Sequence, residues 1–262
     1  MKFHLFQSLA LLFVVVVASH ASVDPAVIND CDLLARLTLY TFDFVTKKAL
    51  FILEKDLHKG KNVNLHISKD AVTSPYVPRQ VADSLPFTSN KIQDIYKAFK
   101  VSPASLEASL IEKTCNKCEK ASNKEEDHYC ANSLESMVDF ASSKLGKRVK
   151  AVSTQVDGNE SAALQGYKVE GVRKLNGDDA VVCHQQYYGY AVQYCHKASK
   201  INAYMVSLVG ENNVKAKAIS VCHEDTSSWN PKHLAFQVLN VKPATYAVCH
   251  FLVENEAAWV PY

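Results

Sequence analysis

The stretch AVVCHQQYYGYAVQYCHKA, residues 180–198, contains two short runs that each lead into a Cys-His dipeptide. Runs of this kind, rich in β-branched and aromatic residues, are typical of β-strands. Successive side chains of a strand point to opposite faces of the sheet. Cys183 and Cys195 are twelve positions apart, an even number, so both can face one side of a hairpin. His184 and His196 would then share the other side.

Similar runs continue through the C-terminal half, where turn signals such as Asn176-Gly177 and Asn230-Pro231 separate several of them. This alternation of short runs and turns indicates an antiparallel sheet. The runs that we interpret as extended are Leu50–Leu53, Val63–Ile67, Val149–Val156, Ala180–Cys183, Tyr190–His196, Asn202–Leu208, Ala216–Cys222, His233–Val241 and Thr245–Val253.

The middle of the chain has a helical pattern instead. One helix is expected to begin near Asn90, and a second at Ser102, with Pro103 in its first turn. A third is expected between Asn132 as N-cap and Gly146. The sequence therefore predicts an α+β fold in one domain, with a helical middle segment and a β-rich, mostly antiparallel C-terminal half.

Residues 1–21 have the layout of a secretory signal peptide: a basic start, an apolar run over Leu9–Ala18 and a small-residue cleavage region ending at Ala21. The apolar run is too short for a membrane span, which needs about 20 residues. We therefore expect a secreted protein. Lys plus Arg total 29 and Asp plus Glu total 27, and this near-balance argues against a nucleic-acid partner.

Secretion makes disulfide bonds the default interpretation of the eight cysteines, so the fold is expected to be disulfide-stapled. Eight cysteines allow 105 pairings, and the sequence alone does not choose among them. The tripeptide Asn159-Glu160-Ser161 makes Asn159 a candidate glycosylation site. The cysteines are Cys31, Cys115, Cys118, Cys130, Cys183, Cys195, Cys222 and Cys249.

Four Cys-His dipeptides occur in the last eighty residues, separated by gaps of ten, 25 and 25 residues, and Trp259 follows the last after eight more. This spacing resembles the C-terminal signature of the plant BURP domain at every element. Further blocks, including Asn64-Leu65-His66 and Trp229-Asn230-Pro231-Lys232-His233, are similar to that family. The resemblance covers residues 40–262 and leaves a short N-terminal segment, 22–39, between the signal peptide and the domain.

The resemblance implies a disulfide between Cys118 and Cys130. It also implies copper, because some BURP proteins are copper-dependent peptide cyclases that crosslink Tyr or Trp side chains. The candidate copper ligands are the histidines of the four dipeptides: His184, His196, His223 and His250. Cys31 and Cys115 lie outside the family pattern, and they are candidates either for a bond to each other or for a reactive thiol.

Three interpretations of the Cys-His pairs remain open. Thiolates and imidazoles together suit two Cys2His2 zinc sites, although oxidised cysteines cannot ligate. Disulfides would instead leave three or four imidazoles, with His233 as a possible addition, for Cu(II) or zinc. In the third interpretation the disulfides staple the sheet and the histidines are structural. Trp259 is expected to be a core anchor.

Two functions compete. One is a non-enzymatic secreted protein of the apoplast, cell wall or vacuole. It would bind copper and have a cell-wall, seed or stress-related developmental role, with a cell-wall polymer as its partner. The other is a copper-dependent oxidative cyclase. Residues 22–39 contain no Tyr, no Trp and no repeat, so a cyclase would have to act on a separate precursor peptide. The missing substrate segment favours the binding role.

Overall fold

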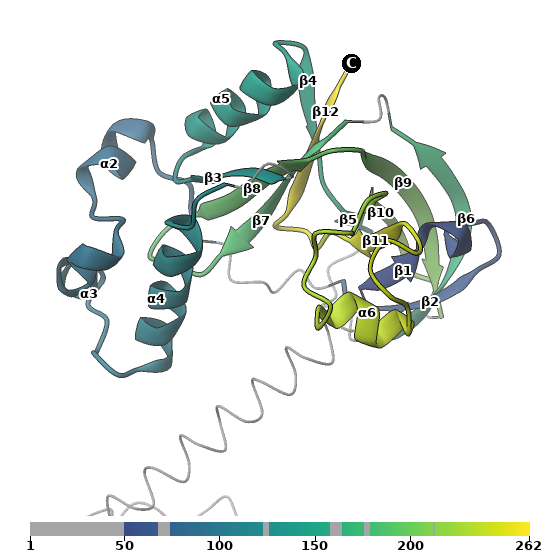
Figure 1. Ribbon diagram of the computed structural model, residues 1–262, viewed down its shortest axis with the longest axis horizontal. Coiled ribbons are helices and arrows are strands. Elements are labelled where there is room, and N and C mark those ends of the chain that lie inside the picture. The colour runs from purple at the N-terminus through teal and green to yellow at the C-terminus, as the bar shows by residue number, and fades with distance from the viewer. Residues whose placement is uncertain (1–49, 68–73, 123–125, 158–163, 176–178, 212) are drawn as a thin grey trace, which may run out of the picture. The chain divides into compact units, whose positions relative to one another are not determined.

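Two antiparallel sheets and five helices make up the described part of the computed structural model (Figure 1). The signal peptide, the segment 22–39, Cys31 and Asn159 lie outside the described residues. The described residues all fall in one compact unit, Phe42–Tyr262. They are 50–67, 74–122, 126–157, 164–175, 179–211 and 213–262.

The larger sheet has seven strands in the order β1-β11-β10-β9-β6-β2, with β5 paired to β10. The smaller has five, in the order β3-β8-β7-β12-β4. Every pairing in both sheets is antiparallel, as the sequence predicts. The strands are β1 Phe51–Leu53, β2 Asn62–Leu65, β3 Glu126–Ala131, β4 Val149–Val152, β5 Gln155–Val156, β6 Gln165–Lys174, β7 Val181–Gln186, β8 Val192–Ala198, β9 Ile201–Gly210, β10 Lys215–His223, β11 Val248–Phe251 and β12 Ala257–Pro261.

The helices lie mainly in the middle of the chain, which confirms the predicted α+β class. α5 packs on the five-stranded sheet, where it contacts β3 and β8, and α6 contacts β1 of the larger sheet. Short 3-10 turns cover Glu54–Asp56 and Ser89–Lys91. The helices are α2 Arg79–Ser84, α3 Ile92–Phe99, α4 Leu106–Cys118, α5 Leu134–Leu145 and α6 Leu234–Leu239.

The prediction of a strand over His233–Val241 is wrong, because this segment forms α6. The side chain of His233 accepts the N–H of Ala235 and caps the helix, and Asn240 ends it in the left-handed region at φ 51°. A short apolar run fits a strand and a buried helix equally well by periodicity alone. The local capping residues decide between them here.

Two helix starts are displaced from their predicted positions. α4 begins at Leu106, where the N–H of Ala108 donates to the Ser105 side chain over 3.1 Å. The predicted start at Ser102 belongs to the preceding turn, in which Ala104 has φ 65°. α5 is capped by Ser133 and not by Asn132, and Gly146 ends it as expected, at φ 88°.

Ser133 and Ser136 form a reciprocal capping box, in which each side chain accepts the backbone N–H of the other over 3.1 Å. We expect Ser133→Ala to lower the free energy of unfolding by about 0.5–2 kcal/mol, because it leaves a buried N–H without its acceptor. Asn132→Ala, one position earlier, should cost less. Urea unfolding of both variants measures the difference, and equal losses would contradict the assignment of Ser133 as the cap.

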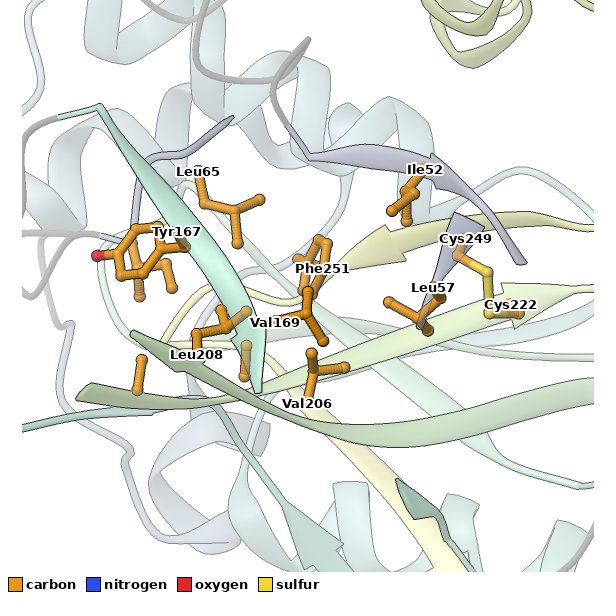
Figure 2. Packing of buried hydrophobic residues seen from close by; sticks show 13 residues of the cluster. Ile52, Leu57, Leu65, Tyr167, Val169, Val206, Leu208, Cys222, Cys249 and Phe251 are labelled. Atoms are coloured by element: carbon orange, nitrogen blue, oxygen red, sulfur yellow. A yellow bond between two sulfur atoms is a disulfide. The ribbon is translucent and has the colours of Figure 1, made fainter. Parts of the chain in front are cut away.

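The core under the seven-stranded sheet surrounds Phe251, which is 2% exposed (Figure 2). Leu65, Val169 and Val206 pack in the same cluster, and the disulfide between Cys222 and Cys249 lies at its edge. A separate cluster contains Trp259, at 7% exposure, together with Cys183 and Cys195. Trp259 is therefore a core anchor, as the sequence predicts.

Cys115 on α4 is fully buried and makes no disulfide with any cysteine of the described residues. Burial, reinforced by the nearby charge of Glu119, raises the pKa of its thiol to about 11. A thiol with so high a pKa is almost wholly protonated at neutral pH and is therefore a poor nucleophile. Its predicted bond to Cys31 involves a residue outside the described part of the chain and stays a prediction.

Candidate metal centre

The four Cys-His dipeptides lie on two pairs of adjacent strands, one pair in each sheet. In the five-stranded sheet Cys183 is directly opposite Cys195, and the two form a disulfide. In the seven-stranded sheet Cys222 is directly opposite Cys249, and these also form a disulfide. Each sheet thus carries a bonded pair of cysteines on one face, which leaves the other face to the neighbouring histidines.

The imidazoles of the two sheets meet in one closed ring of four, which we call the histidine quartet: His184, His196, His223 and His250. Within the sheets the ring centroids of His184 and His196 are 5.4 Å apart, and those of His223 and His250 are 5.7 Å apart. Between the sheets the His184–His250 separation is 5.3 Å and the His196–His223 separation is 5.7 Å. The dipeptides therefore bring their histidines to a single site.

The interior of the quartet favours neutral imidazole. His196 and His223 are 6% and 3% exposed. Burial, helped by the charges of the neighbouring histidines, lowers the pKa of His223 to about 3. Burial likewise lowers the pKa of His196, and that of His250 falls well below its usual value. Neutral imidazole is the form that binds a metal ion.

The donor set fits a nitrogen-ligated ion such as Cu(II) or zinc. As placed, no three His, Cys, Asp or Glu side chains within the described ranges have donor atoms that already converge on one point. His184, His196, His223 and His250 would hold such an ion after their side chains rotate to bring a nitrogen of each ring together. The disulfides leave these four cysteines without thiolates, which excludes the Cys2His2 zinc alternative for this oxidised form.

His233 lies next to the quartet but not in it. Trp229 stands between them, with its ring centroid 4.9 Å from that of His223 and 4.8 Å from that of His233. The Nδ1 atom of His233 accepts the N–H of Ala235 over 3.2 Å, so this nitrogen serves as a helix cap. His233 thus caps α6 and is not a member of the quartet.

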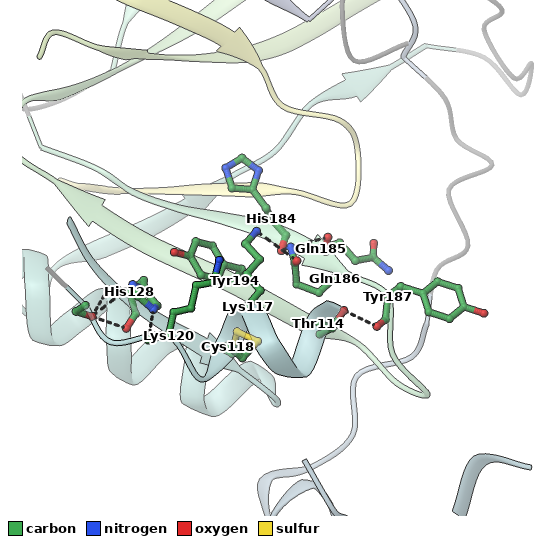
Figure 3. The surroundings of a disulfide bond; sticks show 12 residues. Thr114, Lys117, Cys118, Lys120, His128, His184, Gln185, Gln186, Tyr187 and Tyr194 are labelled. Atoms are coloured by element: carbon green, nitrogen blue, oxygen red, sulfur yellow. Dashed lines mark hydrogen bonds between the residues drawn. A yellow bond between two sulfur atoms is a disulfide. The ribbon is translucent and has the colours of Figure 1, made fainter. Parts of the chain in front are cut away.

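The tyrosines between the first two dipeptides have different surroundings. Tyr188 and Tyr190 are buried against Phe99, while Tyr187 is 42% exposed. Tyr194 lies beside the quartet, 5.9 Å from His196 between ring centroids, and the Lys117 ammonium sits 3.9 Å from its ring centroid (Figure 3). The four are therefore not equivalent, and Tyr194 is the one that contacts a quartet histidine.

A third disulfide supports this side of the molecule. It joins Cys118, the last residue of α4, to Cys130 on β3, as the family resemblance implies (Figure 3). β3 pairs with β8, and His128 lies directly opposite His196. The bond therefore ties the helical segment to the strand that borders the quartet.

Two carboxylates that the sequence analysis did not single out also contact the quartet. Glu126 begins β3 and Glu256 directly precedes β12. Each side chain faces an imidazole, Glu126 that of His196 and Glu256 that of His184. Neither residue lies in a motif, so only the folded chain reveals them.

Comparison with known proteins finds one matching family model and several similar plant proteins. The family model described as "BURP domain" matches residues 50–261. The BURP domain protein RD22 of Arabidopsis thaliana is 49% identical over 220 residues, which cover 82% of this chain and 56% of RD22. BURP domain-containing protein 6 of rice is 40% identical over 218 residues, covering 82% of this chain and 90% of that protein.

A more distant relative is named as an enzyme subunit and not as a BURP-domain protein. The tomato "Polygalacturonase non-catalytic subunit AroGP3" is 33% identical over 213 residues, which are 80% of this chain and 34% of that protein. The chain thus spans about half the length of RD22 and a third of the tomato subunit. None of the helices in the described ranges has the length and hydropathy that crossing a bilayer requires.

Proposed function

The chain belongs to the BURP-domain family, and we propose that it is a secreted protein that binds copper through the histidine quartet. The observation that carries this proposal is the closed ring of four imidazoles, contributed equally by two sheets. A purely structural role would need only that each histidine be packed or hydrogen-bonded separately. Four imidazoles gathered side by side, on strands that two disulfides join, are a stronger match to a metal ion.

Copper is the favoured ion because imidazole sites bind Cu(II) more tightly than the other divalent first-row metals, zinc included. When bound, copper supplies a centre that can change oxidation state. The protein's own part is to hold His196, His223 and His250 neutral, and to exclude most water from His196 and His223. The two disulfides fix the strands that carry the quartet.

A binding role is favoured over the cyclase. The tomato relative is named a non-catalytic subunit, which supports a protein that accompanies a wall enzyme or wall polymer without performing the chemistry itself. The cyclase stays the alternative, with a separate precursor peptide as its substrate.

Native mass spectrometry of the secreted protein, after exposure to Cu(II) and desalting, tests the proposal. We expect one retained copper ion, and none when all four quartet histidines are changed to Gln. His58→Gln is the matched control, because His58 is exposed and bonds the carbonyl of Lys59. The intact mass of the oxidised variant reports whether its disulfides have formed.

A folded wild-type protein that retains no metal would contradict the proposal, as would a quadruple variant that binds copper like the wild type. Incubating the copper-loaded protein with a peptide that contains Tyr and Trp tests the alternative. A new crosslink in that peptide, absent with the quadruple variant, would replace the binding role with the cyclase.

A further inference from the structure

Two carboxylates approach the quartet from outside, and each faces the Nδ1 atom of one imidazole. Glu256 Oε1 lies 2.8 Å from His184 Nδ1, and Glu126 Oε2 lies 3.4 Å from His196 Nδ1. Both side chains are partly buried, at 17% and 33% exposure. The first distance is that of a hydrogen bond. The second is too long for one, and the buried Nδ1 of His196 has no hydrogen-bond partner among the described residues.

The fold holds each carboxylate through its second oxygen. Glu256 Oε2 accepts the backbone N–H of Val253 over 3.3 Å, and Glu126 Oε1 accepts the hydroxyl of Tyr194 over 3.1 Å. Ala257, which follows Glu256, pairs with Cys183, so Glu256 lies beside the strand that carries His184. In each case one oxygen is anchored and the other is left facing the imidazole.

This contact determines which nitrogen can bind a metal. A neutral imidazole has one N–H and one lone pair, and a carboxylate can only accept a hydrogen bond. A carboxylate at Nδ1 therefore keeps the proton on Nδ1 and leaves the lone pair on Nε2. Carboxylate–histidine pairs of this kind orient metal-bound imidazoles in many proteins and increase their basicity.

We infer that Glu256 and Glu126 are positioning residues, which hold His184 and His196 in the Nδ1–H form so that Nε2 of each faces the centre of the quartet. The other two histidines are held differently: His223 packs edge-on against Trp229, and His250 against Phe51. The role of the carboxylates in metal binding rests on the proposed function, whereas the assignment of the protonated nitrogen does not.

The first test needs no metal. Nitrogen-15 NMR of the metal-free protein, labelled at histidine, separates protonated from unprotonated ring nitrogens. We expect His184 and His196 in the Nδ1–H form, and we expect Glu256→Met to shift His184 towards the Nε2–H form that histidine favours in water. Glu54→Met is the matched control, since Glu54 Oε1 accepts the Tyr204 hydroxyl over 2.6 Å and should leave His184 unchanged.

The second test is a Cu(II) titration of the same variants. Loss of an outer carboxylate of this kind weakens metal binding by about 10–100-fold. We expect that loss for Glu256→Met, a smaller loss for Glu256→Gln, whose amide oxygen can still accept the Nδ1–H, and none for Glu54→Met. Glu126→Met should have the smaller effect of the two Met variants, because its contact is longer.

The outcomes separate the two proposals. If the wild-type His184 carries its proton on Nε2, the positioning role is overturned whatever the copper titration gives. If Nδ1 carries the proton but the wild type binds no copper, the proposed function fails and the tautomer assignment stands. If Glu256→Gln and Glu256→Met both abolish binding without moving the proton, Glu256 is itself a ligand, which overturns its positioning role.

Discussion

Removing the Cys222–Cys249 disulfide, by changing both cysteines to Ala, is expected to lower the free energy of unfolding by about 3–4 kcal/mol. The bond links residues 27 positions apart, and the chain between them includes α6, Trp229 and His233. Without the bond the unfolded chain gains the conformational entropy of that loop, which stabilises the unfolded state relative to the folded one. Both cysteines are also completely buried in the core cluster around Phe251, so truncating them leaves unfilled space.

The same variant should bind copper at least tenfold more weakly, because the bond lies directly behind His223 and His250. Urea unfolding and a copper titration measure the two effects. The Cys118→Ala, Cys130→Ala double variant is the control: its loop is twelve residues, so it should lose about 3 kcal/mol. That bond is not in the strands carrying His223 and His250, so copper affinity should change less. A loss of stability below about 1 kcal/mol in the first variant would contradict this account.

The sequence predicted that Cys183 and Cys195 share one face of a strand pair and their histidines the other. It did not predict that the two sheets bring their histidines together. An even spacing between Cys183 and Cys195 allows both thiols to face one side and both imidazoles the other, because the side-chain period of a strand is two. Cys222 and Cys249 are 27 positions apart, an odd number, and α6 lies between them, so spacing did not predict that they are directly opposite in the structure. No spacing rule says that the two pairs lie on different sheets that turn their histidine faces towards each other.

The outer residues of the site were beyond sequence reasoning for a related reason. Glu126 reaches His196 diagonally across the β3–β8 pairing, since Ala198 is directly opposite Glu126 and His128 is opposite His196. Diagonal contact depends on register, which is set by tertiary pairing. The position of Glu256 beside His184 depends in turn on the pairing of β12 with β7. A lone glutamate outside any motif carries no signal of such a contact.

Two further differences between prediction and structure have separate causes. Ser102 and Ser105 are both acceptable N-caps by residue type, and the left-handed conformation of Ala104 places the helix start after the second. β6 was missed although its apolar and polar residues alternate in the stretch Lys168-Val169-Glu170, a pattern typical of a strand with one buried face. Its partners β2 and β9 make it a strand. Strand formation here follows from pairing more than from composition.

Phe251→Ala is expected to lower the free energy of unfolding by about 3–5 kcal/mol, the cost of removing a buried aromatic ring and leaving a cavity. Phe251 is 2% exposed at the centre of the largest core cluster (Figure 2). Tyr246→Ala is the matched control on the same segment. That ring is 46% exposed and its contact with the Lys55 ammonium is worth about 0.5–1 kcal/mol. Thermal or urea unfolding of both variants measures the contrast.

Copper affinity should nevertheless change by less than tenfold in Phe251→Ala. Phe251 and His250 are adjacent on β11, so their side chains point to opposite faces. The position of His250 is fixed by the pairing of β11 with β1 and β10 and by the Cys222–Cys249 bond, all of which the variant retains. A protein that is several kcal/mol less stable but binds copper normally would show that the strand pairing and the disulfides, and not the apolar core, hold the quartet. Loss of binding together with stability would show the opposite.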